Sequence, residues 1–449
     1  MKLKSLCLSF HRLRFFCPTL AAFSASGLVS GQEGVGSLPE LPSGFYEAAA
    51  TEFGESDEPR LSDLDLSLNF QTLYDTNVTQ GNETNSRPIE SDFIVQPTLN
   101  GSYAIGSPNW RLGINGTLGR ITYLETDDFN ATIYSAGLLA EYNREKVSAS
   151  LKTNYADSAG VNRLDGALLE QKNFSSSLLA EYKTEKLRAS LKTGYTEGVN
   201  RLAGVFLEQK NLLSSVEIDY RFSPKTSAEI LLNQESTKNT TQGFADTSSN
   251  SINAGALWQA TPLTRLGPGF RYRVITGFED TEFTAAGPVL RANYKLSTKV
   301  NLSSSLGLDF QELPSGEDKV LNYRMGLTYR ASQLWAANLR MVRDIQATLI
   351  NGVGLDQISS FQFGYTRKIR RATLQLGVAY VNREPLGSSV VVDEFRDSTS
   401  IDYTASLGFP IIGDEVDLKI NLAWREFTTF YGLQSWEGFQ SGLSLAWRF

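Results

Sequence analysis

The sequence predicts an all-β fold, namely a single transmembrane antiparallel up-and-down β-barrel. We expect about 20 strands, within a range of 16 to 20, with short periplasmic turns and longer extracellular loops. Three observations predict it. Apolar and polar residues alternate with a period of two from residue 61 onward, the alternating segments are about 10 to 12 residues long, and short and long connections alternate between them. Tilted strands of that length cross a hydrocarbon core, whereas strands of soluble sheets typically have about five or six residues.

The composition excludes several other classes of protein. The 449 residues have 20% charge and a mean hydropathy of -0.22, which excludes a bundle of membrane helices, since each helix needs roughly 20 consecutive apolar residues. The 37 glycines and 11% aromatic residues favour β-structure over disorder. The net charge of -7 argues against a nucleic-acid partner, because such proteins normally carry a basic surface.

The chain divides into three predicted parts. Residues 1–31 have the pattern of a secretory signal peptide, with basic residues, then a mostly apolar stretch, then small residues that end at Gly31. Residues 32–60 carry prolines and acidic residues without a clear period and are expected to be a flexible periplasmic leader. Residues 61–449 are expected to form the outer-membrane β-barrel.

The first part also holds every histidine and cysteine of the chain. The only histidine is His11, and the two cysteines are Cys7 and Cys17. If the signal peptide is removed, no imidazole remains to act as a general base, so hydrolysis by a histidine-assisted nucleophile is excluded. The nearest carboxylate pair, Asp127 and Asp128, has the pattern of a solvated loop. We therefore expect no enzyme, no cofactor and no metal site.

The C-terminal strand shows the alternation most clearly. One face carries Phe439, Ser441, Leu443, Leu445, Trp447 and Phe449, whereas the other carries small or polar residues. Strands of a soluble β-sandwich also alternate, so a single strand decides nothing. The length of the strands and the charged residues on their polar face favour the barrel.

The connections and the aromatic residues repeat along the barrel region. Short links are predicted at 107–109, 143–146, 183–186, 223–225, 297–299 and 411–414, and long links at 75–91, 156–172, 196–210, 236–248 and 384–398. Aromatic residues beside the short links are Tyr103, Tyr142, Tyr182, Tyr220, Tyr294, Tyr329 and Tyr365, and those before the long links are Tyr74, Tyr123, Tyr155, Tyr195, Phe278, Phe310 and Tyr380. Two aromatic rings at the headgroup levels are the simplest explanation.

An internal repeat indicates how the barrel could have grown. The segment from Leu138 to Thr153 recurs in large part from Leu178 to Thr193. Two strands and one turn form the repeated unit, which is typical of a duplicated hairpin in a barrel with an even number of strands. A solenoid is the alternative at this period, but only two strong copies are present.

Two short segments resemble known outer-membrane proteins. The alternating C-terminal residues Leu443, Leu445, Trp447 and Phe449 resemble the assembly signal of Gram-negative outer-membrane β-barrels, and Leu73-Tyr74-Asp75-Thr76-Asn77-Val78 resembles the opening strand of the β-barrel porin 2 family. The resemblance implies a location in the cell outer membrane and a porin-like barrel. It also implies contacts with outer-membrane lipid and with the barrel-assembly machinery, and it carries no catalytic residues.

The polar face supplies the candidate functional residues. In the register set by Phe449, the pore-lining candidates are Arg111, Lys152, Arg188, Lys192, Arg271, Arg273, Arg291, Lys295, Arg324, Arg340, Lys419 and Arg425. Charges on the lipid side would cost about 2 to 4 kcal/mol each at mid-depth, so they should face a wet or paired interior. Two interpretations remain open. These residues form cross-strand ion pairs that brace the wall, or a basic ladder that includes Arg271, Arg273, Arg291 and Arg324 favours anionic solutes.

The width of the expected barrel then decides the predicted function. Barrels of 16 to 18 strands leave an aqueous channel. The sequence therefore predicts a porin-like barrel that gives passive or weakly selective diffusion of small hydrophilic solutes, including anionic ones. The alternative is a surface adhesin, or an outer-membrane conduit or assembly element for an exported polymer, which would act through the long loops or a wide lumen.

Overall fold

The computed structural model describes residues 62–79, 89–161, 168–202, 205–239, 246–277, 282–297, 299–313, 316–347, 355–386, 397–413, 415–429 and 435–449. The predicted signal peptide and leader lie outside these ranges. The described elements are β1 (Ser62–Asp75), β2 (Asp92–Ser107), β3 (Trp110–Tyr123), the 3-10 turn η1 (Asp127–Phe129), β4 (Ala131–Arg144), β5 (Val147–Val161), β6 (Leu168–Lys183), β7 (Leu187–Leu202), β8 (Val205–Ser223), β9 (Thr226–Asn239), β10 (Thr247–Thr261), β11 (Thr264–Thr276), β12 (Glu282–Lys295), β13 (Val300–Leu313), β14 (Gly316–Ser332), β15 (Trp335–Ala347), β16 (Leu355–Ile369), β17 (Ala372–Leu386), β18 (Ser398–Ile412), β19 (Val416–Thr429) and β20 (Trp436–Arg448).

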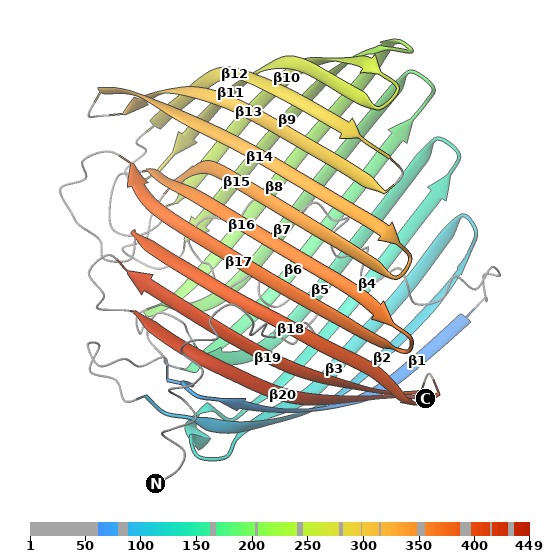
Figure 1. Ribbon diagram of the computed structural model, residues 1–449, viewed down its shortest axis with the longest axis vertical. Helices are drawn as coiled ribbons and strands as arrows, with labels where there is room; N and C mark the ends of the chain where they lie inside the picture. Colours follow the sequence, from blue (N-terminus) through green and yellow to red (C-terminus); the bar gives the residue numbers. More distant parts are fainter. Residues whose placement is uncertain are drawn as a thin grey trace.

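These strands form one closed barrel (Figure 1). Each strand pairs antiparallel with its neighbours in sequence, and β1 pairs with both β2 and β20. Closure leaves no strand edge to face lipid, where unpaired backbone groups would be costly. The predicted 20-stranded antiparallel barrel is confirmed. In the described ranges, no helix is long and apolar enough to cross a membrane.

The two rims of the barrel differ in their connections. Tight turns join each even-numbered strand to the next strand, at the rim where β1 begins and β20 ends, on the right in Figure 1. Two of the predicted long links on the other rim are wrong. β5 continues to Val161 and β6 begins at Leu168, while β7 continues to Leu202 and β8 begins at Val205. The backbone pairing continues through these segments, as far as Val161 opposite Leu168 and Leu202 opposite Val205. Polar runs such as Glu170-Gln171-Lys172-Asn173 interrupt the period of two, so the sequence there resembled a loop.

The apolar face of each strand points outward. Leu66, Leu68 and Phe70 of β1 pair in register with Gly101, Leu99 and Pro97 of β2, and the three β1 side chains remain exposed. On β20, Leu443, Leu445, Trp447 and Phe449 are 39% to 62% exposed. The register carries this face around the barrel as a continuous band, which is the surface that lipid acyl chains cover. The barrel is therefore of the outer-membrane type, as predicted.

Among the described members of the predicted aromatic rings, Tyr123 is misplaced, and the predicted member Phe278 lies outside the described residues. Tyr103, Tyr142, Tyr182 and Tyr220 are exposed on the outer wall beside the short turns, as a ring at the headgroup level requires. Tyr123 instead points inward and packs with Val78, Ile94, Leu73 and Ile121. Odd-numbered residues of β3 face inward, because even-numbered ones such as Leu112 and Ile114 are exposed on the outer wall. The prediction that Tyr123 belongs to the outer aromatic ring, made from its place beside a loop, was therefore wrong.

The Leu73–Val78 motif joins the first strand to the last one. The Thr76 amide donates to the Phe439 carbonyl oxygen at 2.9 Å, and the Phe439 amide donates to Thr76 Oγ1 at 2.9 Å. Asn77 Nδ2 donates to the Glu437 carbonyl oxygen at 2.7 Å. Gln440 Nε2 donates to Asp75 Oδ2 at 2.5 Å, and the same carboxylate accepts the Asn77 amide. This motif therefore fastens the seam where the barrel closes.

We expect Asn77→Ala to weaken the closed barrel. Asn77 is 4% exposed, and its loss leaves the Glu437 carbonyl oxygen without this donor, which costs about 1–3 kcal/mol. The temperature at which the folded barrel loses its faster migration in gels should fall. Asn143→Ala, at an exposed position near the end of β4, should leave that temperature unchanged. An equal shift in both variants would contradict the conclusion that this motif fastens the seam between β1 and β20.

Candidate functional site

All twelve predicted lining residues lie on the inward face. On β11, Arg271 and Arg273 alternate with Phe270 and Tyr272, which are exposed on the outer wall. The strand register carries the same parity through the other strands, and it places each of the twelve opposite the apolar band. Their function as the lining of a transport path stays a prediction.

The barrel wall folds back on itself between β11 and β15. The backbones of these strands approach within 8 Å, although three strands separate them along the wall. An apolar cluster of Ile275, Phe283, Val320, Ile345 and Leu355 fills the inside of this corner toward the long loops. The interior is therefore packed here, and we call the region from β11 to β15 the closed corner.

Glycines permit the close strand packing in the closed corner. A Cβ atom on Gly287 of β12 would lie 1.8 Å from the Leu308 carbonyl oxygen, so no other residue fits without a backbone shift. At Gly307 of β13, an added Cβ would lie 3.8 Å from the Arg271 guanidinium. The small inward residues therefore leave the space that the arginine side chains occupy.

The first ion pair of the closed corner joins β11 to β13. Arg271 Nη2 lies 2.5 Å from Asp309 Oδ2, and Asn322 Nδ2 of β14 donates to the same oxygen at 2.7 Å. The Asp309 side chain is 1% exposed and the Arg271 side chain is 13% exposed. A carboxylate buried this deeply requires such charged partners.

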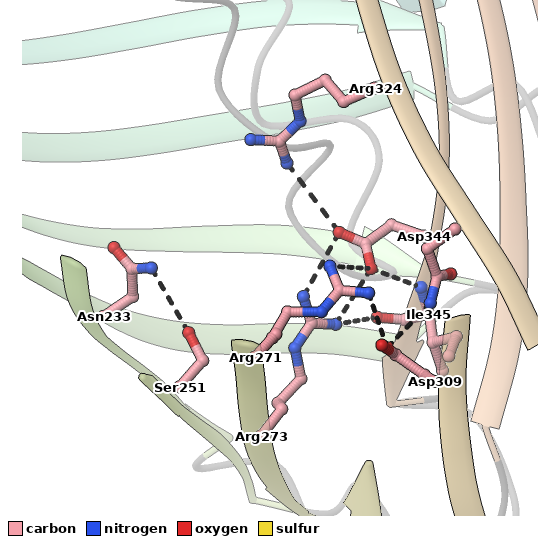
Figure 2. A network of polar contacts seen from close by, with 9 residues as sticks. Asn233, Ser251, Arg271, Arg273, Asp309, Arg324, Asp344 and Ile345 are labelled. Atoms are coloured by element: carbon pink, nitrogen blue, oxygen red, sulfur yellow. Dashed lines mark hydrogen bonds and ion pairs between the residues drawn. The ribbon is translucent and has the colours of Figure 1, made fainter. Parts of the chain in front are cut away.

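A second carboxylate, Asp344 of β15, lies among three arginines (Figure 2). Arg273 Nη1 lies 3.1 Å from Asp344 Oδ1 and donates to the Ile345 carbonyl oxygen at 2.8 Å. Arg271 Nη1 is 3.9 Å from Asp344 Oδ1, and Arg324 Nη2 is 3.8 Å from Asp344 Oδ2. The Arg324 side chain is 54% exposed, so its guanidinium reaches the carboxylate while it still faces the lumen.

The ion pairs correct the expected basic ladder. Of its four arginines, Arg271 and Arg273 contact carboxylates of β13 and β15, and Arg291 Nη1 lies 3.0 Å from Glu229 Oε1 on β9. Elsewhere, Arg188 pairs with Glu181 at 2.9 Å. The alternative of cross-strand ion pairs therefore describes these arginines better than a row of free positive charges.

The sequence reasoning missed Asp344, which holds the cluster together. The polar alternation of β15, with Asn338, Arg340, Val342 and Asp344 on one face, was weak because Val342 interrupts it. Asp344 is four residues after Arg340 and therefore lies on the same inward face, so extending the period of two along β15 would have identified it. Its partners Arg271 and Arg273 are more than 70 residues away in sequence, so no local pattern pairs them.

Several buried polar atoms of the closed corner have unused hydrogen-bonding capacity. Within the described part of the chain, no hydrogen bond reaches Asp309 Oδ1, Asn322 Oδ1 or the amide atoms of Gln311. Buried polar atoms are usually paired, so these acceptors and donors are unusual. These atoms are buried behind the surface of the lumen, whereas Arg324 at the edge of the same cluster is half-exposed.

The expected absence of a metal site stays a prediction. Over the residues that the structure describes, no group of three or more His, Cys, Asp or Glu is placed to hold a metal ion. Asp127 and Asp128 lie in η1, on the connection between β3 and β4.

No family model and no curated protein matches this sequence. Solved structures do match the fold. The FrpB iron transporter from Neisseria meningitidis is 9% identical with a TM-score of 0.54, and the match covers 90% of this chain and 83% of that chain. The Ferric-Catecholate import receptor Fiu from E. coli K12 is 10% identical with a TM-score of 0.51, over 87% and 82% of the two chains. The ferric citrate transporter FecA is 11% identical with a TM-score of 0.51, over 86% and 79%.

These similarities establish the fold and correct the functional prediction. The chain has the fold of Gram-negative outer-membrane receptors, and this confirms the predicted location in the outer membrane. The predicted passive or weakly selective porin is wrong, because these similar barrels are named as an iron transporter, an import receptor and a ferric citrate transporter. None of the three is named as an adhesin or a polymer conduit.

We expect Asp344→Asn to destabilise the barrel. The substitution keeps the side-chain volume but leaves Arg273 and Arg271 without their shared negative charge, which should cost about 3 kcal/mol. Urea unfolding in lipid vesicles measures the change. Glu181→Gln is the matched control, because its partner Arg188 is 51% exposed and the loss should stay below about 1 kcal/mol. Equal losses of unfolding free energy in the two variants would show that the closed corner depends on its ion pairs no more than β6 and β7 depend on the exposed pair of Glu181 and Arg188.

Proposed function

We propose that this protein takes up a specific polar solute, of the size and chemistry of a metal chelate, across the outer membrane. The similarity to barrels named for ferric citrate, ferric catecholate and iron transport supports this class of solute. Those barrels are named as receptors and transporters, which favours transport over catalysis for this chain as well.

The observation that carries the proposal is the position of Arg324 beside the anchored cluster of the closed corner. The buried carboxylates Asp309 and Asp344 anchor the neighbouring arginines of the closed corner, and Arg324 lies at the edge of this cluster. A guanidinium held next to a rigid charged network loses little conformational freedom when a ligand binds, so it favours specific recognition. A lining of mobile side chains would not give that advantage.

The chemistry of the closed corner defines what it could bind. The half-exposed Arg324 guanidinium donates hydrogen bonds and matches carboxylate or phenolate oxygens. Asp309 and Asn322 are buried, so Arg324 is the group of this cluster that can meet a solute in the lumen. A chelate that presents carboxylate or phenolate oxygens fits this guanidinium.

Binding of ferric citrate and of a ferric catecholate to the purified full chain tests the proposal. We expect saturable binding of at least one complex, measured by tryptophan fluorescence quenching and by isothermal titration calorimetry. Arg324→Ala should weaken this binding by about tenfold or more, as the loss of a charge-assisted hydrogen bond predicts.

Arg188→Ala provides the matched control, because Arg188 also faces inward and is exposed to a similar extent but lies on β7. It should leave the dissociation constant unchanged. If neither complex binds saturably, or if both arginine variants lose affinity equally, the closed corner is not a recognition site for these chelates.

A further inference from the structure

The short turns carry exposed basic residues around much of their rim. We call the following residues the basic rim: Arg144, Lys146, Lys183, Lys186, Arg221, Lys225, Lys299, Arg330, Arg367, Arg370 and Arg371, all of them exposed. The same turns contain only two acidic residues, Glu145 and Glu185. The rim is therefore strongly positive although the whole chain carries a net charge of -7.

The opposite rim has the reverse charge. Its described connections and strand ends carry Glu90, Asp92, Glu125, Asp127, Asp128, Asp246, Glu282 and Asp397. The β18–β19 turn on the short-turn rim carries Glu415, and the β2–β3 turn carries no charge. The basic residues of the short turns therefore gather in an arc from β4 to β17, and a general need for solubility does not explain that arrangement.

The backbone holds the basic rim in a regular arc. Lys146, Lys186 and Lys225 occupy equivalent places in three consecutive even-to-odd turns, and each carbonyl oxygen accepts a hydrogen bond from the next strand. The Lys183 amide donates to Lys146 at 2.8 Å, the Arg221 amide to Lys186 at 2.7 Å, and the Gln259 amide to Lys225 at 2.7 Å. These turns are thus fixed relative to one another.

The three lysines also lie at the depth of lipid headgroups. Tyr142, Tyr182 and Tyr220 are exposed on the outer wall four or five residues before them. Exposed tyrosines of membrane barrels mark the headgroup level, and lysine side chains just beyond it extend toward the phosphates. In the part of the chain that the structure describes, no ion pair reaches Lys146, Lys186 or Lys225.

We propose that the basic rim binds the phosphate headgroups of anionic phospholipids in the periplasmic leaflet. Short turns mark the periplasmic side of such barrels. Clustered lysines and arginines at a membrane surface attract anionic lipids through the phosphate charge. The attraction acts around the β4–β17 arc and does not depend on which solute the lumen takes up.

Native mass spectrometry of the full chain tests the proposal, after equilibration in micelles with equal amounts of phosphatidylglycerol and phosphatidylcholine. We expect the wild-type protein to retain phosphatidylglycerol in excess. The triple variant Lys146→Gln, Lys186→Gln, Lys225→Gln should lose this preference by about fivefold for each charge removed.

A control variant removes three exposed basic residues near the other rim, namely Arg120→Gln, Lys172→Gln and Lys238→Gln. It should keep the wild-type preference. An equal loss in both variants, or no phosphatidylglycerol preference in the wild-type protein, overturns the proposal.

The wild-type protein alone gives a second measurement in case the triple variant does not fold. Raising the salt from about 0.01 M to about 1 M shortens the Debye length from roughly 30 Å to 3 Å. The phosphatidylglycerol preference should fall steeply over this range. A preference that does not change with salt would mean that charge does not select the lipid, which also contradicts the proposal.

Discussion

Backbone hydrogen bonding in hydrocarbon is the constraint on which this structure depends. Each amide and carbonyl group in the bilayer needs a partner within the protein, so the sheet has to close. Closure requires β1 to pair with β20. Just after the end of β1, at the long-loop rim, the side chains of Thr76 and Asn77 form hydrogen bonds with the backbone of β20. The motif that resembles the opening of a porin family is thus explained here by the geometry of closure.

Once the barrel is closed, its interior determines what it does. The wall is not uniform, because β11 and β15 approach each other and enclose ion pairs beneath an apolar cluster. Buried carboxylates there hold arginines in place, whereas Arg188 on β7 stays largely exposed beside its partner Glu181. A lumen with one rigid, charged side is suited to recognise a solute, and a uniformly solvated bore is not.

The charged residues outside the lumen are distributed unequally between the two rims. Basic residues gather at the short turns and acidic residues at the opposite rim, so the two ends of the barrel meet different surroundings. The inner wall, the apolar band and the turn rim therefore have three different compositions on one sheet. Because side chains of a strand alternate between faces, these compositions could be separated without adding a domain.

A strand number near 20, the outward apolar face and the inward parity of residues such as Arg271 and Arg324 could be predicted from the sequence, because each follows from a local period of two. The three-dimensional structure was needed to show that Tyr123 packs inside, that β5 extends to Val161, and that Asp344 meets arginines of β11. Those facts depend on the register and curvature of a wall whose contacting residues are distant in sequence, and no local period encodes them.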